Sequence, residues 1–176
     1  MQTAERRKSA SRTFPNKMTV FREFQFSWLM VSLMLAVEAL ICFFYITQLG
    51  DNPLDLQAFL IFSAFFVVIL SIFYGMTTTV HDKKVHIAFG IGLIRKNIQL
   101  ESVASVEVVK NPWYYGYGIR LIPNGWLYNV SGLSAVELRF RGRKGVTRIG
   151  SKRAAELKAA IEERIAPPSS RSYAGK

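Results

Sequence analysis

Two uninterrupted hydrophobic segments dominate the first half of the chain. Residues 27–49 contain a single charged side chain, and residues 56–76 contain none. About 20 apolar residues are enough for a helix to cross the hydrocarbon core of a bilayer. Residues 50–55 separate the segments and include Gly50, Asn52 and Pro53, which favour a tight turn. The pattern therefore predicts a membrane hairpin of two antiparallel helices over residues 27–76.

The pattern changes after Met76 to short alternating runs separated by turn residues, which is typical of antiparallel β-structure. We expect strands at Thr77 to His81, Val85 to Phe89, Leu93 to Leu100, Ala104 to Val109, Ile119 to Ile122, Trp126 to Val130, Ala135 to Phe140 and Val146 to Ile149. An amphipathic helix follows Ser151, because Leu157, Ile161 and Ile165 recur at four-residue intervals. The sequence predicts an all-β domain closed by one C-terminal helix.

Several motifs in this second half resemble a known family. They are GIR at Gly118 to Arg120, GWLYNVSG ending at Gly132, and RIG at Arg148 to Gly150. The stretch from Ile94 to Ile161 is similar to membrane-anchored bacterial proteins whose soluble part is pleckstrin-homology-like (PH-like). The resemblance implies a bent β-sandwich or partial barrel, in a family largely without an assigned biochemical function.

One position departs from the family pattern. An acidic or Asp-Pro start to the final helix is expected from the resemblance, whereas this chain has Ser151, Lys152 and Arg153. No role of acidic residues at that helix start is therefore carried over to this chain.

The charges orient the predicted hairpin. The net charge is +11, and the segment before the first span carries six basic residues against Glu5 and Glu23. The short turn contains Asp51 and Asp55 and no base. Cytoplasmic flanks are enriched in Lys and Arg, so both termini are expected in the cytoplasm. A cleaved signal peptide is the alternative for the first span, but no small-residue cleavage pattern follows it.

These observations predict four regions. Residues 1–26 form a basic cytoplasmic tail, 27–76 the transmembrane hairpin, 77–165 the PH-like β domain with its terminal helix, and 166–176 a disordered Pro/Ser-rich tail. With the resemblance, they predict a multi-pass protein of the bacterial inner membrane.

Glu38 lies near the middle of the first predicted span. A carboxylate at that depth costs about 2.5–3.5 kcal/mol on insertion scales. We expect a neutral Glu38 that is hydrogen-bonded to Ser63 or Ser71 across the hairpin, or to a second subunit. A proton-relay or ligand-binding role is the alternative.

Two surfaces of the β domain are candidates for binding. Basic residues on turns are expected to approach anionic lipid headgroups, with a merely solvated face as the alternative: Lys83, Lys84, Arg141, Arg143 and Lys144. An aromatic block is the second candidate, either at headgroup level or as a recognition surface: Trp113, Tyr114, Tyr115 and Tyr117. The alternation of Trp126 and Tyr128 places these two rings in the core.

No enzyme signature is present, and we expect no catalytic residue and no cofactor. Cys42 is the one cysteine and His81 and His86 are the only histidines, too few for a metal site. The positive charge already has a topological explanation, so we expect no nucleic-acid partner.

The sequence thus predicts a non-catalytic, membrane-anchored module that binds protein or anionic lipid. The alternative is an accessory or assembly subunit of a membrane complex, or a homo-oligomer, recognised through Glu38 and the hairpin.

Overall fold

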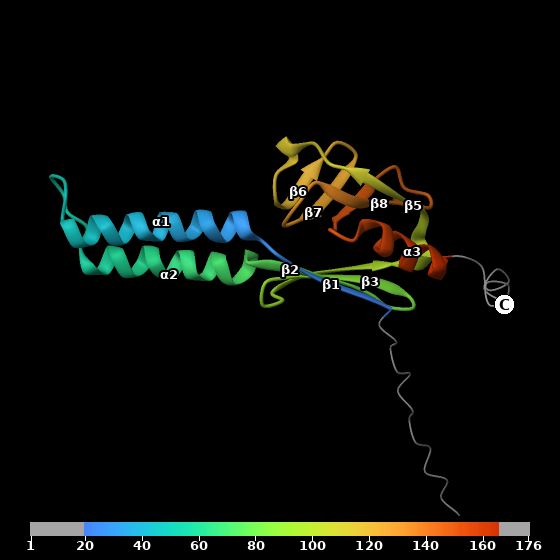
Figure 1. Ribbon diagram of the computed structural model, residues 1–176, viewed down its shortest axis with the longest axis horizontal. Coiled ribbons are helices and arrows are strands. Elements are labelled where there is room, and N and C mark those ends of the chain that lie inside the picture. The colour runs from blue at the N-terminus through green and yellow to red at the C-terminus, as the bar shows by residue number, and fades with distance from the viewer. Residues whose placement is uncertain (1–19, 166–176) are drawn as a thin grey trace, which may run out of the picture.

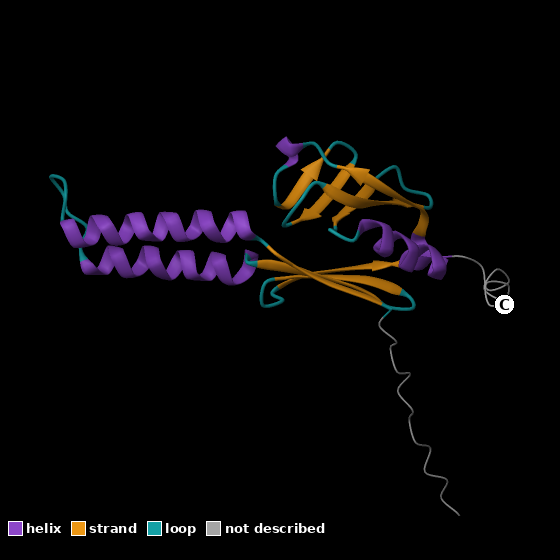
Figure 2. Cartoon of the chain, viewed as in Figure 1, coloured by secondary structure: helices purple, strands orange, loops and turns teal. Residues whose placement is uncertain are grey.

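A computed structural model describes residues 20–165 of the chain. A pair of long helices projects from one end of a β-rich part that is built from two sheets and a C-terminal helix (Figures 1 and 2). This layout confirms the coarse prediction of an apolar helical hairpin followed by strands and one terminal helix. The predicted tail at 166–176, and the part of the basic tail before residue 20, lie outside the described residues.

The two helices are α1 (Trp28–Thr47) and α2 (Leu56–Phe73). Asp55 begins α2, where its side chain accepts a hydrogen bond from the Ala58 amide at 2.7 Å. None of the residues in either helix is buried, and both helices are long and apolar enough to cross a membrane. A core helix of a soluble protein would instead be mostly buried.

The helices continue directly into an antiparallel sheet, here called sheet A. Its strands follow the order β1 (Phe21–Phe26), β2 (Gly75–Val80), β3 (Lys84–Phe89) and β4 (Ile94–Gln99). β1 enters α1 and β2 leaves α2, and the two strands pair along their whole length. The Ser27 amide also donates to the Tyr74 carbonyl at 2.9 Å. The helical hairpin and the β1–β2 ladder therefore form one continuous hairpin.

Strand β1 corrects the sequence interpretation, which ended the basic tail at residue 26. The inner face of β1 carries Phe21, Glu23 and Gln25, all buried, and only the first of them is apolar. A buried strand face is normally recognised by alternating apolar residues, so this one gave no signal. The β domain consequently begins before the first helix.

The second sheet, sheet B, has the strand order β5 (Val103–Lys110), β8 (Ser134–Phe140), β9 (Val146–Gly150), β7 (Gly125–Asn129) and β6 (Gly118–Ile122). Short 3-10 helices, η1 (Leu100–Ser102) and η2 (Trp113–Tyr115), flank β5. β7 and β9 pair in parallel, so the sheet is not a simple meander. All eight predicted strands overlap β2 to β9.

Helix α3 (Ala154–Ile165) packs between the sheets, at the end of the β-rich part away from α1 and α2 (Figure 1). Its buried face includes Leu157 and Ile161, which join Phe89 and Leu138 in the common core. This helix closes one end of the sandwich, as predicted.

Glu23 of β1 stands at the start of this helix. Its carboxylate accepts hydrogen bonds from the Ser151 hydroxyl at 2.6 Å and from the Lys152 amide at 3.1 Å. A negative charge is favourable there because the amide groups of a helix N-terminus point toward it. β1 therefore supplies an acidic group at this helix start, in addition to Glu156 in the first turn of the helix.

Candidate membrane-surface site

The β3–β4 turn, residues Gly90 to Leu93, is fixed against the last turn of α2. The Ile91 amide donates to the Ser71 carbonyl at 3.1 Å, and the Gly90 amide donates to the Gly75 carbonyl at 2.8 Å. Gly90 has a φ of +50°, and a Cβ at this position would lie 2.1 Å from the Ser71 carbonyl oxygen. Only glycine allows this close approach. The turn therefore lies at the level where the helices end.

Exposed apolar side chains surround this level. Ile91 and Leu93 extend from the turn, and Trp28 begins α1. All three are more than 60% exposed. Tryptophan is enriched where a membrane meets water, and apolar turn residues there lose contact with water when they enter the interface.

A cavity of about 420 Å³ opens on the outer face of sheet A beside this turn. The polar residues that line it are Arg22, Thr77, Thr79, His81, His86 and Arg95. None of the described lining residues is acidic. Guanidinium, imidazole and hydroxyl groups are donors that suit a phosphate or carboxylate.

Strand register brings these side chains together from distant parts of the chain. Arg22 of β1 pairs with Thr79 of β2, which in turn pairs with His86 of β3. One row nearer the helices, Ala88 of β3 pairs with Arg95 of β4. These four polar residues come from four different strands, which is why sequence spacing did not identify the site.

Two polar groups of the cavity are held by neighbours. The Arg95 Nε donates to the Gly92 carbonyl at 2.5 Å, which holds the guanidinium over the turn. The His86 Nδ1 lies 2.7 Å from the Asn97 Oδ1. Thr77 follows the helix end at Tyr74 by three residues, about 10 Å of strand. That distance is slightly more than the depth of a headgroup layer, which extends roughly 5–8 Å beyond the hydrocarbon core on each side.

The predicted basic cluster lies elsewhere. Lys83 and Lys84 are at the opposite end of sheet A, beyond Val80, which is six residues or about 20 Å from Tyr74. Arg141 donates its amide to the Ser102 carbonyl at 2.8 Å, also beyond the far end of β4. Arg143 and Lys144 share that β8–β9 turn. These five residues therefore lie farther from the helix ends than Arg95, which shares the row of Ala88 and Thr77.

A second, larger cleft of about 760 Å³ lies between β4 and sheet B. A neighbouring cavity of about 340 Å³ shares Lys96, Trp126 and Tyr128 with it. Tyr128 is buried, as expected, and burial raises the pKa of its phenol. Trp126 is 48% exposed, which corrects the expectation of a core position. Its alternation indicated the correct face, but beside β4 that face borders the cleft and the neighbouring cavity, so the ring is only partly covered.

The aromatic block divides into two pairs. Trp113 and Tyr114 on η2 are exposed, at 81% and 67%. Tyr115 and Tyr117 are half-buried. The Arg148 guanidinium lies over the Tyr115 ring, 5.9 Å from its centre. The short helix η2 is on the side of the β-rich part that faces α1 and α2 (Figure 2), so its two exposed rings remain candidates for the membrane interface.

Arg148 also belongs to a structural network on the outer face of sheet B. Its Nε donates to Glu137 at 2.8 Å, and its Nη1 donates to Asn111 at 3.1 Å. Arg139 contacts the same Glu137 carboxylate at 3.0 Å. The buried Glu137 is thus paired and hydrogen-bonded, as a buried charge requires.

In the hairpin, neither predicted partner bonds to Glu38. Ser71 instead donates to the Val67 carbonyl at 2.8 Å, which corrects that expectation. Glu38 Oε2 and Ser63 Oγ are both inaccessible and have no hydrogen-bond partner among the described residues.

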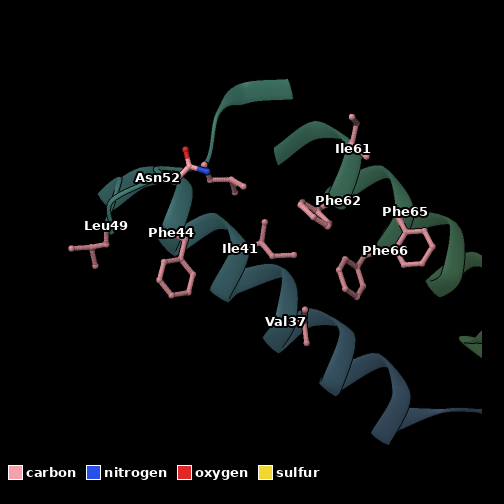
Figure 3. Close-up of a pocket in the computed structure, with 10 residues that line it drawn as sticks. Val37, Ile41, Phe44, Leu49, Asn52, Ile61, Phe62, Phe65 and Phe66 are labelled. Carbon is pink, nitrogen blue, oxygen red and sulfur yellow. The ribbon is translucent and has the colours of Figure 1, made fainter. Parts of the chain in front are cut away.

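Toward the α1–α2 turn, the hairpin carries an apolar groove of about 740 Å³. Val37, Ile41 and Phe44 line it from α1, and Phe62 and Phe66 from α2 (Figure 3). Asn52 is its one lining residue with a polar side chain among those described.

Neither the family models, nor the curated proteins, nor the solved structures with which the chain was compared include a match. Within residues 20–165, no group of three or more His, Cys, Asp or Glu residues is placed to hold a metal ion.

Proposed function

We propose that this protein is a non-catalytic module anchored in the bacterial inner membrane, with a PH-like β domain that binds anionic phospholipid headgroups at the cytoplasmic surface. The observation that carries the proposal is the continuous hairpin of α1, α2, β1 and β2. It brings Arg95 and the turn that borders the basic cavity close to the level where the helices end.

Three features support a hairpin that spans the bilayer and is not removed by cleavage of a signal peptide. α1 has 20 residues, about 30 Å of helix, which equals the thickness of a hydrocarbon core. The exposed side chains of both helices are predominantly apolar. Cleavage after α1 would also remove β1, a fully paired strand of sheet A, which argues against a signal peptide.

The continuous hairpin also constrains topology. Because β1 and β2 are paired, the chain enters and leaves the membrane on one side, independently of any charge rule. The assignment of that side to the cytoplasm rests on the basic N-terminal segment and the acidic turn. The PH-like identity and the bacterial origin rest on the family resemblance.

The ligand follows from the chemistry of the cavity. A phosphodiester is a multiple hydrogen-bond acceptor with one negative charge, which complements the Arg22 and Arg95 guanidinium groups. A basic side chain near an anionic surface contributes about 1 kcal/mol. Two such side chains correspond to about a 30-fold preference for anionic over zwitterionic lipid.

The test is native mass spectrometry of the full chain in detergent with added short-chain phosphatidylglycerol or phosphatidylcholine. We expect the double variant Arg22→Gln, Arg95→Gln to lose the preference for phosphatidylglycerol. The control is the double variant Lys83→Gln, Lys84→Gln, which removes the same amount of charge at the far end of sheet A. This variant should keep the preference for phosphatidylglycerol. Equal binding of both lipids by the unmodified protein, or equal loss in both variants, would overturn the proposal.

A second candidate function, an accessory subunit of a membrane complex, is favoured by the unpaired atoms of the hairpin. Glu38 Oε2 and Ser63 Oγ lack partners, and a polar group in lipid is stabilised when a neighbouring helix supplies a partner. We expect Glu38→Leu to insert and fold normally but to lose a co-purifying membrane protein or a second copy of this chain. If the variant is absent from the membrane, Glu38 has a different role.

A further inference from the structure

The free edge of β4 forms one wall of the 760 Å³ cleft. β4 is the last strand of sheet A, and within residues 20–165 it pairs only with β3. Four consecutive residues, Lys96 to Gln99, line the cleft, so the backbone itself is part of its wall. An unpaired strand edge presents a row of amide and carbonyl groups that another extended chain can bind.

The remaining cleft chemistry is aromatic and basic. Trp126, half-exposed, lies on the sheet B side. Lys96, Arg141 and Arg143 also line the cleft, and none of its described lining residues is acidic. The charge of the cleft therefore complements an acidic ligand.

We propose that this cleft binds an extended peptide segment with acidic side chains, which adds a strand to the edge of β4. A peptide backbone alternates donors and acceptors and so matches a strand edge, whereas a nucleic-acid backbone offers only acceptors. Glutamate or aspartate on the side facing sheet B contacts the basic residues. This interaction is separate from headgroup binding on the opposite face of sheet A.

The direction of β4 identifies the kind of partner. β4 begins at Ile94, directly after the turn that is fixed to α2, and runs away from the helices. Its six residues span about 20 Å. A segment that emerges from another membrane helix can follow β4 in the same way that β1 and β2 continue α1 and α2. The partner is thus a membrane protein with an acidic juxtamembrane segment.

The test uses the full chain in phosphatidylcholine nanodiscs, with Trp28→Phe and Trp113→Phe so that Trp126 is the single tryptophan. The probe is an acetylated eight-residue peptide of alternating threonine and glutamate, titrated against Trp126 fluorescence. Two control peptides replace glutamate by lysine or carry N-methyl groups on the threonine amides. We expect saturable binding of the probe and at least about tenfold weaker binding of both controls.

Neighbouring residues on one turn supply matched variants. Arg143 lines the cleft and Lys144 does not, so Arg143→Gln should weaken probe binding severalfold and Lys144→Gln should leave it unchanged. The absence of saturable binding would overturn the proposal. So would equal binding of the N-methylated peptide, equal effects of the two variants, or tighter binding of an eight-residue oligothymidine than of the probe.

Discussion

The helical hairpin and the β-rich part differ in the exposure of their apolar side chains. In the hairpin, Leu35 and Phe65 are mostly exposed and no residue is buried. In the β-rich part, Leu157 and Leu138 are completely buried in one core. The β-rich part thus buries its own apolar core, whereas the apolar side chains of the hairpin have no such cover and require an apolar environment.

The junction between these regions determines what the protein can reach. β1 and β2 pair with each other and continue directly into α1 and α2, and the inner face of β1 is attached to sheet B. Gln25 donates to the Gly150 carbonyl at 2.8 Å, and Ser27 donates to the Val130 carbonyl at 3.1 Å. Sheet B is therefore joined to the hairpin by direct hydrogen bonds, which limit rotation of sheet B against α1 and α2.

The largest expected effect comes from truncating a buried leucine to alanine in the β-rich part, and the same truncation in the hairpin is its control. Leu157→Ala removes a fully buried side chain and should cost about 2–5 kcal/mol of unfolding free energy. Leu35→Ala removes an exposed side chain of α1 and should leave the stability of the β-rich part unchanged. Guanidinium unfolding in detergent, followed by circular dichroism, measures both. Similar losses in the two variants would contradict the comparison.

The next effect tests the junction. Glu23→Ala removes the acceptor for the Ser151 hydroxyl and the Lys152 amide, and should cost about 1–3 kcal/mol because buried donors lose their partner. Arg22→Ala changes the adjacent, outward-facing residue of β1 and serves as the control for stability. The same unfolding measurement applies, and a harmless Glu23→Ala would show that the carboxylate does not hold α3.

A third variant tests the contact between the turn and α2. Gly90→Ala forces a side chain against the Ser71 carbonyl, in addition to about 1–2 kcal/mol for the left-handed backbone. Gly142→Ala has a similar φ of +69° but meets no atom within 4 Å. Hydrogen exchange of the Ile91 amide should accelerate only in the first variant. Unchanged exchange would mean that the turn is not fixed to the helix.

The smallest effect concerns an exposed pair on α3. The hydrogen bond from Arg153 lowers the pKa of the Glu156 carboxyl from its ordinary value of 4.5. A lowered pKa stabilises the fold above pH 4.5 and loses that contribution as the pH falls through the lowered value. Glu156→Gln should therefore lower the melting temperature slightly at pH 7 and not at all in strong acid. If the difference in melting temperature between the variant and the unmodified protein grew in acid, it would contradict a lowered pKa of Glu156.

The sequence predicted the elements whose signal is local. The hairpin follows from composition, and β2 to β9 follow from alternation and turn residues. β1 was missed because Glu23 and Gln25 occupy its buried face, where their partners come from residues more than a hundred positions away. The cavity on sheet A was missed for the same reason, since strand register rather than spacing assembles it.

Trp126 shows the corresponding limit for burial. Alternation assigns a side chain to one face of a strand, but it does not show whether another element covers that face. Lys83 and Lys84 show a similar limit for the prediction of binding surfaces. Two adjacent lysines in a predicted turn indicate that the side chains are exposed, but they do not indicate at which end of a sheet the lysines lie.

Cysteine accessibility tests the central claim most directly, which is that α1 and α2 cross the membrane and keep β1 and β2 on one side. In a Cys42→Ser background, single cysteines at Asp51→Cys and Lys83→Cys are exposed to a membrane-impermeant maleimide, in intact and in lysed cells. The account predicts that Asp51→Cys is labelled in intact cells and Lys83→Cys only after lysis. Labelling of both positions from the same side would contradict it.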